Sequence, residues 1–364
     1  KRSDHHHLTG FRIRNETTNH NEEWERNRHM YFVDNQGQLD PSVNIALETF
    51  LLKEKILDEP ILLFYINEPS IIIGRNQNTI EEINADYVEA NKIHIVRRMS
   101  GGGAVYHDLG NFSFCFITKD DGDSFRDFGK FTKPVISFLH SVGVKEAELK
   151  GRNDLVIGEK KFSGNAMYAT NGRMTAHGTI LFDSDLDAVT SALKPRKEKI
   201  ESKGIKSIRS RVTNIKPFVD EAYQNLTTEQ FRDLMLLSIF DVETREEVKE
   251  YHLTDEDWKR VYEIREEYFG NWDWNYGKSP KFEIQKHHRF PIGSIEVRLN
   301  VEEGHIQQLK IFGDFFGLGE IKDVEEAFIG VKYAKQDILD KLNELDIKKY
   351  FGNVTAEELL EELY

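Results

Sequence analysis

Residues 97–111 read Arg-Arg-Met-Ser-Gly-Gly-Gly-Ala-Val-Tyr-His-Asp-Leu-Gly-Asn, and this stretch is the most informative in the chain. Glycine has no Cβ, so consecutive glycines let the main chain approach a ligand closely and take positive φ angles. The preceding Arg97 and Arg98 supply planar cations that suit phosphate or carboxylate. We therefore expect an anionic ligand, a nucleotide, against the main chain here. A flexible turn is the alternative interpretation of the glycines alone.

The glycine run differs from the two common nucleotide-binding loops. It lacks the Gly-Lys-Ser/Thr ending of the phosphate loop of NTPases. It also lacks the Gly-x-Gly-x-x-Gly spacing of dinucleotide-binding folds. The apolar neighbours Val105 and Tyr106 indicate a ligand that also has a hydrophobic part.

The composition of the 364-residue chain narrows its class. The formal charge of −14 argues against nucleic acid as the main partner. The single cysteine, Cys115, cannot form an internal disulfide, which fits a reducing cytoplasm. No apolar run approaches the ~18 residues of a membrane span, and the first residues of the sequence hold no apolar signal-peptide core, so export is not indicated. We expect a cytoplasmic protein without membrane contact, and a monomer by default.

Two composition shifts divide the chain. Residues 1–29 are polar, contain His5-His6-His7 and end in a His-Met junction, so we expect an expression tag and linker; a native disordered tail is the alternative. Aromatic, glycine and proline residues cluster at 271–280. We therefore expect a domain boundary here, with one domain over residues 30–275 and a second, smaller domain over residues 280–364.

Strands are expected mostly in succession rather than in alternation with helices, which favours α+β over a doubly wound parallel sheet. The capping signals are Asp40-Pro41, Thr227-x-x-Gln230, Thr254-x-x-Asp257 and Thr355-x-x-Glu358. Beyond the boundary we expect three strands and then two helices, at 335–345 and 356–364.

Three further stretches carry polar side chains suited to a site. In Gly151-Arg-Asn-Asp-Leu155, Asp154 is a candidate metal ligand or adenosine contact, or merely stabilises a turn. If residues 161–166 form a strand, Lys161, Ser163 and Asn165 share a polar face typical of a site wall; a solvated Lys-Lys turn at a hairpin tip is the alternative. His177 contacts a ligand or is a packed strand residue. The basic run 194–211 is a loop that closes over phosphate, or a solvated surface.

These motifs together resemble the lipoate–protein ligases. The matching segments are residues 74–78 (Gly-Arg-Asn-Gln-Asn), 97–111, 151–155, 161–164 (Lys-Phe-Ser-Gly), 177–179 (His-Gly-Thr) and 206–211 (Lys-Ser-Ile-Arg-Ser-Arg). The resemblance covers essentially all of the chain after residue 29. It implies the catalytic fold of biotin and lipoate–protein ligases, an α+β fold of mixed sheets flanked by helices, with a small α+β C-terminal domain.

The resemblance also implies an activity. ATP and lipoate, with Mg²⁺, would give lipoyl-AMP and pyrophosphate, and the lipoyl group would then pass to a lysine of a lipoyl domain. The acceptors implied are E2 subunits of 2-oxoacid dehydrogenases and the glycine-cleavage H protein. No tightly bound prosthetic group is implied.

Site residues follow from the family motifs. Adenylation builds negative charge on the α-phosphate and the carbonyl oxygen, and the resemblance implies Lys161 as the catalytic cation, because it occupies the family's lysine position before x-Ser-Gly. ATP and adenylate contacts are implied for Arg98, Gly103, Ala104, Val105, Tyr106, Asn153, Asp154 and Lys161. Lipoate contacts are implied for Arg75, Ser100, Gly101, Gly102, His107, Lys161, Ser163, Gly164 and His177. Lys194, Lys206 and Arg209 would belong to the loop that closes over the adenylate, and Asp154 is the candidate Mg²⁺ ligand.

Three rivals remain. Octanoyl or lipoyl transferases of the same superfamily can use a cysteine nucleophile, but Cys115 lies in an aromatic strand-like run and is expected in the core. A biotin ligase would carry a Gly-Arg-Gly-Arg signature, which the sequence lacks. A non-catalytic protein that binds lipoate or a nucleotide would not need Lys161 or the basic run.

Overall fold

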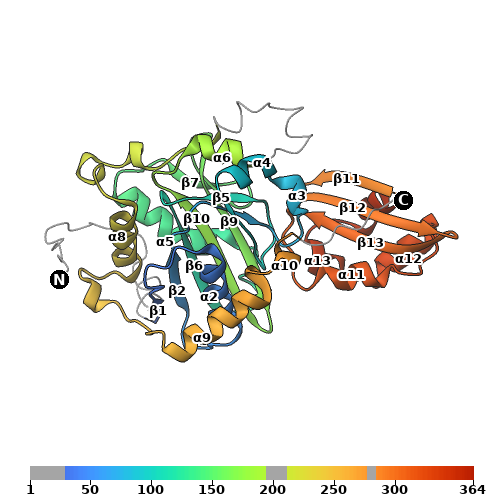
Figure 1. Cartoon of the computed structure of the whole chain (residues 1–364), viewed down its shortest axis with the longest axis horizontal. Helices are drawn as coiled ribbons and strands as arrows, with labels where there is room; N and C mark the ends of the chain where they lie inside the picture. The colour runs from blue at the N-terminus through green and yellow to red at the C-terminus, as the bar shows by residue number, and fades with distance from the viewer. Residues whose placement is uncertain (1–28, 194–210, 277–283) are drawn as a thin grey trace.

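The computed structural model describes residues 29–193, 211–276 and 284–364 (Figure 1). The strands in these ranges form a large mixed sheet, a small mixed sheet and an antiparallel sheet near the C-terminus. Helices cover the sheets rather than alternate with each strand. The expected α+β fold is therefore confirmed. No helix of the described ranges is both long and apolar enough to cross a membrane.

The large sheet has seven strands in the order β1-β2-β6-β10-β9-β8-β7. Its strands are β1 (Tyr31–Val33), β2 (Ile61–Tyr65), β6 (Asn111–Lys119), β7 (Ala147–Lys150), β8 (Asp154–Ile157), β9 (Lys160–Thr170) and β10 (Arg173–Leu181). Only β1 and β2 pair in parallel. The other neighbours are antiparallel, and the β8–β9 pairing shifts register between Leu155 and Val156.

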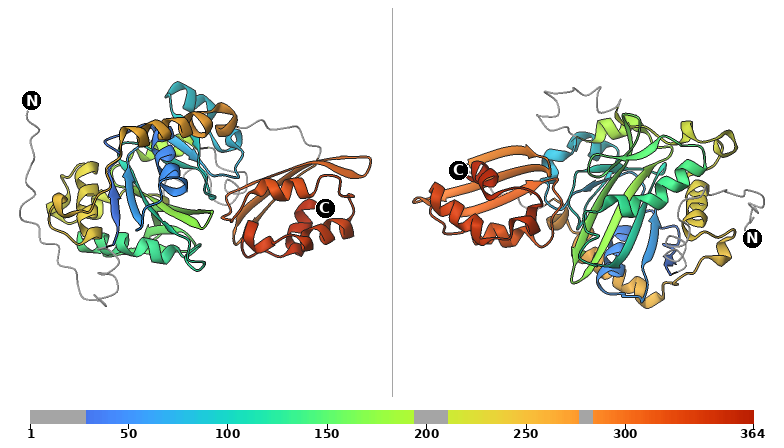
Figure 2. Two further views of the ribbon diagram at one scale, coloured as in Figure 1. Left: turned by 90° about the horizontal axis from the view of Figure 1, so that it is seen from below. Right: turned by 180° about the vertical axis from the view of Figure 1, so that it is seen from behind.

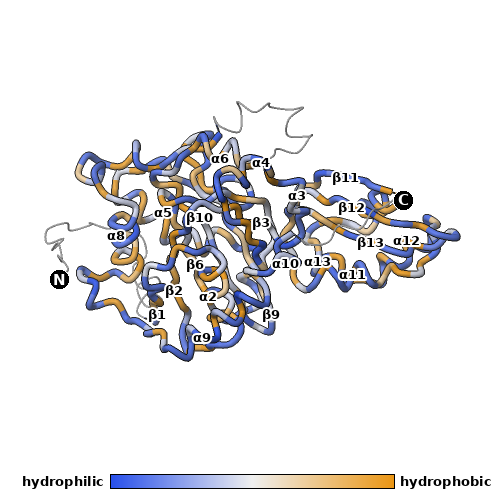
Figure 3. The backbone as a smooth tube through the Cα atoms, viewed as in Figure 1, coloured by the Kyte–Doolittle hydropathy of each residue, from blue (hydrophilic) through white to orange (hydrophobic). Residues whose placement is uncertain are grey.

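The two faces of this sheet carry different cores, because successive side chains of a strand point to opposite faces. On β2, Leu62 and Phe64 join a phenylalanine-rich core, whereas Leu63 and Tyr65 join a second core on the other face. Helices α5 (Phe128–Ser141) and α8 (Thr228–Phe240) belong to the first core, and α2 (Pro41–Lys53) and α9 (Asp255–Ile264) to the second. Figure 3 shows hydrophobic segments along these strands and hydrophilic turns around them.

The small sheet has the order β4-β3-β5 and places the glycine run. Its strands are β3 (Ser70–Ile73), β4 (His94–Arg97) and β5 (Val105–His107). The glycines connect β4 to β5, which both pair with β3. The nearby helices are α3 (Thr79–Glu82), α4 (Ala85–Ala90), α6 (Leu186–Ala192) and α10 (Trp272–Asn275). Short turns of 3-10 helix occupy 216–218, 221–223 and 245–247, and a π-helical turn occupies 265–269.

The C-terminal sheet lies beside the helices that follow it in the chain (Figure 2), and together they enclose a core of their own. Its strands are β11 (Ile284–Phe290), β12 (Gly293–Glu302) and β13 (His305–Gly313), followed by α11 (Ile321–Ala327), α12 (Lys335–Glu344), α13 (Ile347–Phe351) and α14 (Ala356–Leu363). The three strands and the two longer helices were expected. Helices α11 and α13 were missed, since they have only seven and five residues and show little periodicity.

Candidate active site

A cavity of about 670 Å³ opens between α2, strands β9 and β10, and the glycine run. Its size is that of a small-molecule site. The motifs come together here although they are far apart in sequence. The expected site residues that line the cavity are Arg98, Ser100, Gly103, Ala104, Val105, Tyr106, His107, Asn153, Asp154, Lys161, Ser163, Gly164 and His177.

One end of the cavity is charged. Lys161 Nζ lies 3.0 Å from a carboxylate oxygen of Asp154, and both side chains are about two-fifths exposed, at 39% and 41%. The lysine ammonium lies over Gly164, where an added Cβ would come within 3.3 Å of it. Arg152 and Arg211 line the same cavity. This end therefore presents fixed cations to a ligand.

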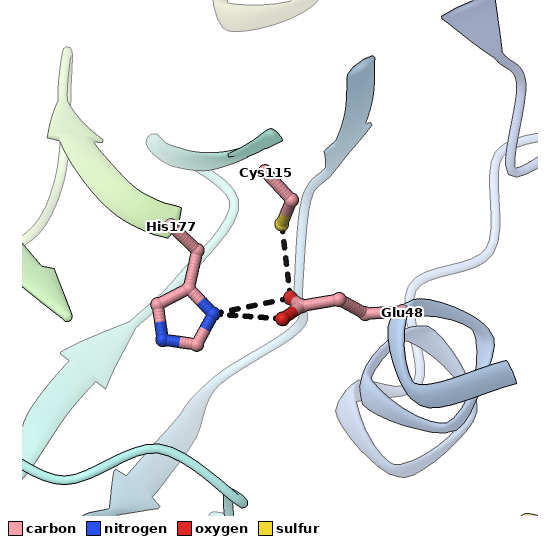
Figure 4. A group of neighbouring side chains, drawn as sticks. All are labelled: Glu48, Cys115 and His177. Atoms are coloured by element: carbon pink, nitrogen blue, oxygen red, sulfur yellow. Dashed lines mark hydrogen bonds and ion pairs between the residues drawn. The ribbon is translucent and has the colours of Figure 1, made fainter. Parts of the chain in front are cut away.

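The inner end holds a buried carboxylate that sequence analysis missed. Glu48 accepts hydrogen bonds from Cys115 Sγ at 2.9 Å and His177 Nδ1 at 2.9 Å (Figure 4). It also accepts from Tyr65 Oη at 3.2 Å and Thr175 Oγ1 at 3.1 Å. Burial raises the pKa of Glu48, but the charge of His177 and the hydrogen bonds outweigh burial, so the pKa is lowered overall. An acidic residue within the apolar run of α2 was the available signal.

Glu48 orients His177, which in turn contacts Ser100. Ser100 Oγ lies 2.8 Å from His177 Nε2, and Arg98 Nε donates to the same oxygen at 3.1 Å. Ser100 Oγ is therefore bonded to both Arg98 and His177 Nε2, while His177 Nδ1 bonds to Glu48. His177 lines the cavity, and both of its ring nitrogens have protein partners, Ser100 and Glu48.

Glu48, Cys115 and His177 also have the spacing of a metal-ligand group, and they form the one such group among the described residues. Their ligand atoms, however, already bond to one another. Burial, and then the Glu48 charge, raise the pKa of Cys115 well above its ordinary value. The thiol therefore keeps its proton and donates it to Glu48.

Arg98 shapes the loop around the cavity. Its guanidinium donates to the carbonyls of Ile72 at 3.2 Å, Gly101 at 2.9 Å and Gly103 at 2.8 Å. Burial lowers the pKa of Arg98 to about 10, so it stays charged at neutral pH. Most of its donors are occupied by the protein's own backbone rather than turned toward the ligand space.

Arg97 also binds backbone carbonyls, but it does not line the cavity. It donates to the carbonyls of Gly74 at 3.1 Å and Gln77 at 2.5 Å, and to Thr79 Oγ1 at 2.8 Å. Arg97 therefore holds the segment that follows β3, and Arg98 holds the glycine loop that follows β4.

Three residues expected in the lipoate pocket lie elsewhere. Arg75, Gly101 and Gly102 are not among the cavity-lining residues, because the C-terminal domain packs on their side of the loop. Arg75 pairs with Glu320. The Gly102 N–H donates to the carbonyl of Phe315 at 3.3 Å, and a Cβ on Gly101 would overlap that carbonyl.

The basic run of residues 194–211 was the remaining segment expected at the site. Lys194, Lys206 and Arg209 lie outside the described residues. The residues at its two ends, Leu193 and Arg211, both line the cavity.

Comparison with known families shows the class of the protein. Residues 40–240 match the model of the lipoyl protein ligase A/B catalytic domain. Residues 279–363 match the model of the bacterial lipoate protein ligase C-terminus. The chain therefore belongs to the lipoate–protein ligase family, and it is an enzyme of that class.

Individual lipoate–protein ligases match this chain over nearly their full length. The chain is 55% identical to lipoate-protein ligase LplJ of Bacillus subtilis over 92% of this chain and 100% of the relative. It is 47% identical to lipoate–protein ligase 1 of Staphylococcus aureus, over 91% of this chain and 99% of that protein. The resemblance noted from the motifs is confirmed.

Solved structures are also similar to this chain. That of Plasmodium falciparum LipL1 in complex with lipoate has a TM-score of 0.72 at 26% identity, and covers 92% of this chain and 98% of that one. A bipartite lipoate protein ligase of Thermoplasma acidophilum, studied with its E2 lipoyl domain, has a TM-score of 0.58 at 29% identity (70% and 99% covered). A lipoate-protein ligase A bound with ATP has a TM-score of 0.56 at 27% identity (68% and 98% covered).

Proposed function

We propose that this ligase acts in two steps on ATP and lipoate. A carboxylate oxygen of lipoate attacks the α-phosphorus of ATP, and pyrophosphate leaves. The ε-amine of an acceptor lysine then attacks the acyl carbon of lipoyl-AMP, AMP leaves, and the amine loses a proton. The observation that carries the proposal is the pairing of a cationic mouth, at Lys161, with a cavity that continues between apolar side chains. The relatives solved with lipoate and with ATP support it.

The cavity wall suggests how the two parts of the intermediate are held. Ile45, Leu52 and Ile72 line the interior and suit an acyl chain. Lys161, held by Asp154, stabilises charge on the phosphate and on the carbonyl oxygen. The candidates for adenylate contact are Arg98, Gly103, Ala104, Val105, Tyr106, Asn153 and Asp154. Those for lipoate contact are Ser100, His107, Ser163, Gly164 and His177.

Mg²⁺ is proposed together with ATP. Asp154 offers one carboxylate to the ion, and that carboxylate also pairs with Lys161. One carboxylate together with substrate phosphates is a usual Mg²⁺ environment. The ion would neutralise phosphate charge when bound.

The remaining features of the proposal concern partners and organisation. We propose E2 lipoyl domains and the glycine-cleavage H protein as acceptors, and the archaeal relative studied with its E2 lipoyl domain supports the first. A monomer, a cytoplasmic location and a loop around 194–209 that closes over the adenylate belong to the same proposal. So does the division into residues 30–275 and 280–364, which the separate C-terminal core supports.

A single reconstitution tests the activity. The protein is mixed with ATP, lipoate and an apo lipoyl domain, and pyrophosphate release and acceptor mass are followed. We expect both products, and neither without ATP. Acceptor modification from an acylated donor without ATP would instead favour a transferase. That rival lacks an accessible nucleophile, because Cys115 is fully buried and donates to Glu48.

A further inference from the structure

His107 presents an unpartnered hydrogen-bond donor at the cavity. It lies at the end of β5, is 4% exposed and lines the cavity. Nδ1 lies 2.9 Å from the amide nitrogen of Asn67. Nε2 is buried and has no partner among the described residues. Buried polar groups in folded proteins are nearly always satisfied, so a free one at a cavity indicates a ligand contact.

The tautomer of His107 follows from Asn67. The Asn67 side-chain oxygen accepts from the amide nitrogen of Asn44 at 2.9 Å. The NH₂ group of Asn67 must therefore face His107. An NH₂ group can only donate. Nδ1 accordingly accepts, and the single proton of the neutral ring resides on Nε2.

Backbone groups, which cannot flip, fix the direction of this chain of amides. Asn44 Nδ2 also donates to the Gln38 carbonyl at 2.9 Å, so its oxygen points the other way and accepts from Asn35 Nδ2 at 2.9 Å. The Asn35 oxygen in turn accepts from the Gly37 N–H at 3.3 Å. The amides of Asn35, Asn44 and Asn67 thus have one consistent orientation that ends at His107.

The surroundings keep the ring neutral. Burial, with the nearby charges of Arg98 and His177, lowers the pKa of His107 to about 3. At neutral pH the ring therefore acts as an uncharged donor. Such a donor does not form a strong ion pair with a ground-state carboxylate, but its hydrogen bond strengthens as charge develops on an oxygen.

We propose that His107 Nε2–H is the donor to the acyl oxygen of the bound acid, and that Asn67 is the positioning residue that fixes this tautomer. The inference rests on the proposed function, which supplies the acid. His107 lines the same cavity as Lys161 and the apolar Ile72, and it lies near Arg98 and His177, so it is placed to meet the carboxyl end of an acyl chain bound there. When the acceptor amine attacks, the acyl oxygen gains negative charge and this donor stabilises it.

The first test reads the tautomer directly in the ligand-free protein. Long-range ¹H–¹⁵N spectra of ¹⁵N-histidine-labelled full chain distinguish a protonated from an unprotonated ring nitrogen. We expect His107 to carry its proton on Nε2 at neutral pH. In Asn67→Asp the carboxylate can only accept, and we expect the proton on Nδ1. Asn214→Asp, which alters an amide bonded to the Ser184 backbone, is the matched control and leaves His107 unchanged.

The second test measures catalysis with preformed lipoyl-AMP and an apo lipoyl domain. We expect Asn67→Asp and His107→Phe to lower the single-turnover transfer rate by about 100-fold, as loss of an oxyanion donor does. His107→Gln, which keeps an amide donor, is expected to restore part of the rate. A Nδ1–H tautomer in the unmodified protein, or an unchanged rate in His107→Phe, would overturn the proposal. If the unmodified protein shows the expected tautomer but makes no pyrophosphate, the proposed function fails instead.

Discussion

Lys161 and Asp154 meet at 3.0 Å where strands β9 and β8 begin, at the mouth of the cavity. Both side chains are too exposed for their pairing to add much to stability, since such pairs contribute about 0–1 kcal/mol. What the pairing does is fix a flexible lysine over Gly164. A cation held at one place suits a reaction in which charge develops on phosphate and acyl oxygens.

Replacing this cation should abolish the first step. We expect Lys161→Ala to lower pyrophosphate release by a factor on the order of 100 or more, with the circular dichroism spectrum unchanged. Lys160→Ala, which removes the exposed neighbouring lysine, is the matched control and should keep full activity. Near-normal pyrophosphate release by Lys161→Ala would refute the role.

Cys115→Ala should preserve activity. The thiol is buried and protonated, and Tyr65, Thr175 and His177 still hold Glu48 after it is removed. We expect ligation within about threefold of normal and a stability loss of about 1 kcal/mol, the contribution of a typical hydrogen bond. Intact-mass spectra should show no thioester on the unmodified protein. A covalent acyl group on Cys115 would favour the transferase instead.

Glu48→Gln should destabilise the fold in a pH-dependent way. The folded pKa of Glu48 lies below its ordinary value of 4.5. Its stabilising effect is therefore present above that value and is lost as pH falls through the folded pKa. At pH 7 we expect a loss of about 3 kcal/mol in urea unfolding, shrinking in acid. Glu89→Gln, on the exposed side of α4, should show no such trend. An equal loss at all pH values would contradict this account.

Two glycines of the same loop should differ in their effect on domain packing. A Cβ on Gly101 would overlap the Phe315 carbonyl, whereas a Cβ on Gly103 would come no nearer than 3.9 Å to Asp314. We therefore expect Gly101→Ala to displace the C-terminal domain and raise the radius of gyration in small-angle X-ray scattering. Gly103→Ala should leave it unchanged. Identical scattering from both variants would exclude a tight contact at Gly101.

Local signals in the sequence predicted helix starts well. Asp40 accepts from the Ser42 N–H ahead of α2, and reciprocal capping boxes open α8, α9 and α14 at Thr227, Thr254 and Thr355. These features depend on residues two or three positions apart. The glycine run and the Lys-x-Ser-Gly segment were likewise recognisable, because each is contiguous.

Contacts between distant segments could not be predicted in this way. Glu48 and His177 lie 129 positions apart, and Asn67 and His107 lie 40 apart. Sequence alone also could not show that Arg98 donates mainly to the loop, or that Arg75 and Gly101 turn toward the C-terminal domain. Arginine suits carbonyl and phosphate oxygens equally well, so only the folded chain decides between them.

The loop of Gly101–Gly103 faces the cavity on one side and the C-terminal domain on the other. Gly103 borders the cavity, while the Gly102 N–H bonds the Phe315 carbonyl of the C-terminal domain. Any compound that fits better when Phe315 is seated must, by thermodynamic reciprocity, tighten that seating by the same factor. The small domain also borders the cavity directly, through Asp314 and Phe316, so a ligand there meets residues of both domains.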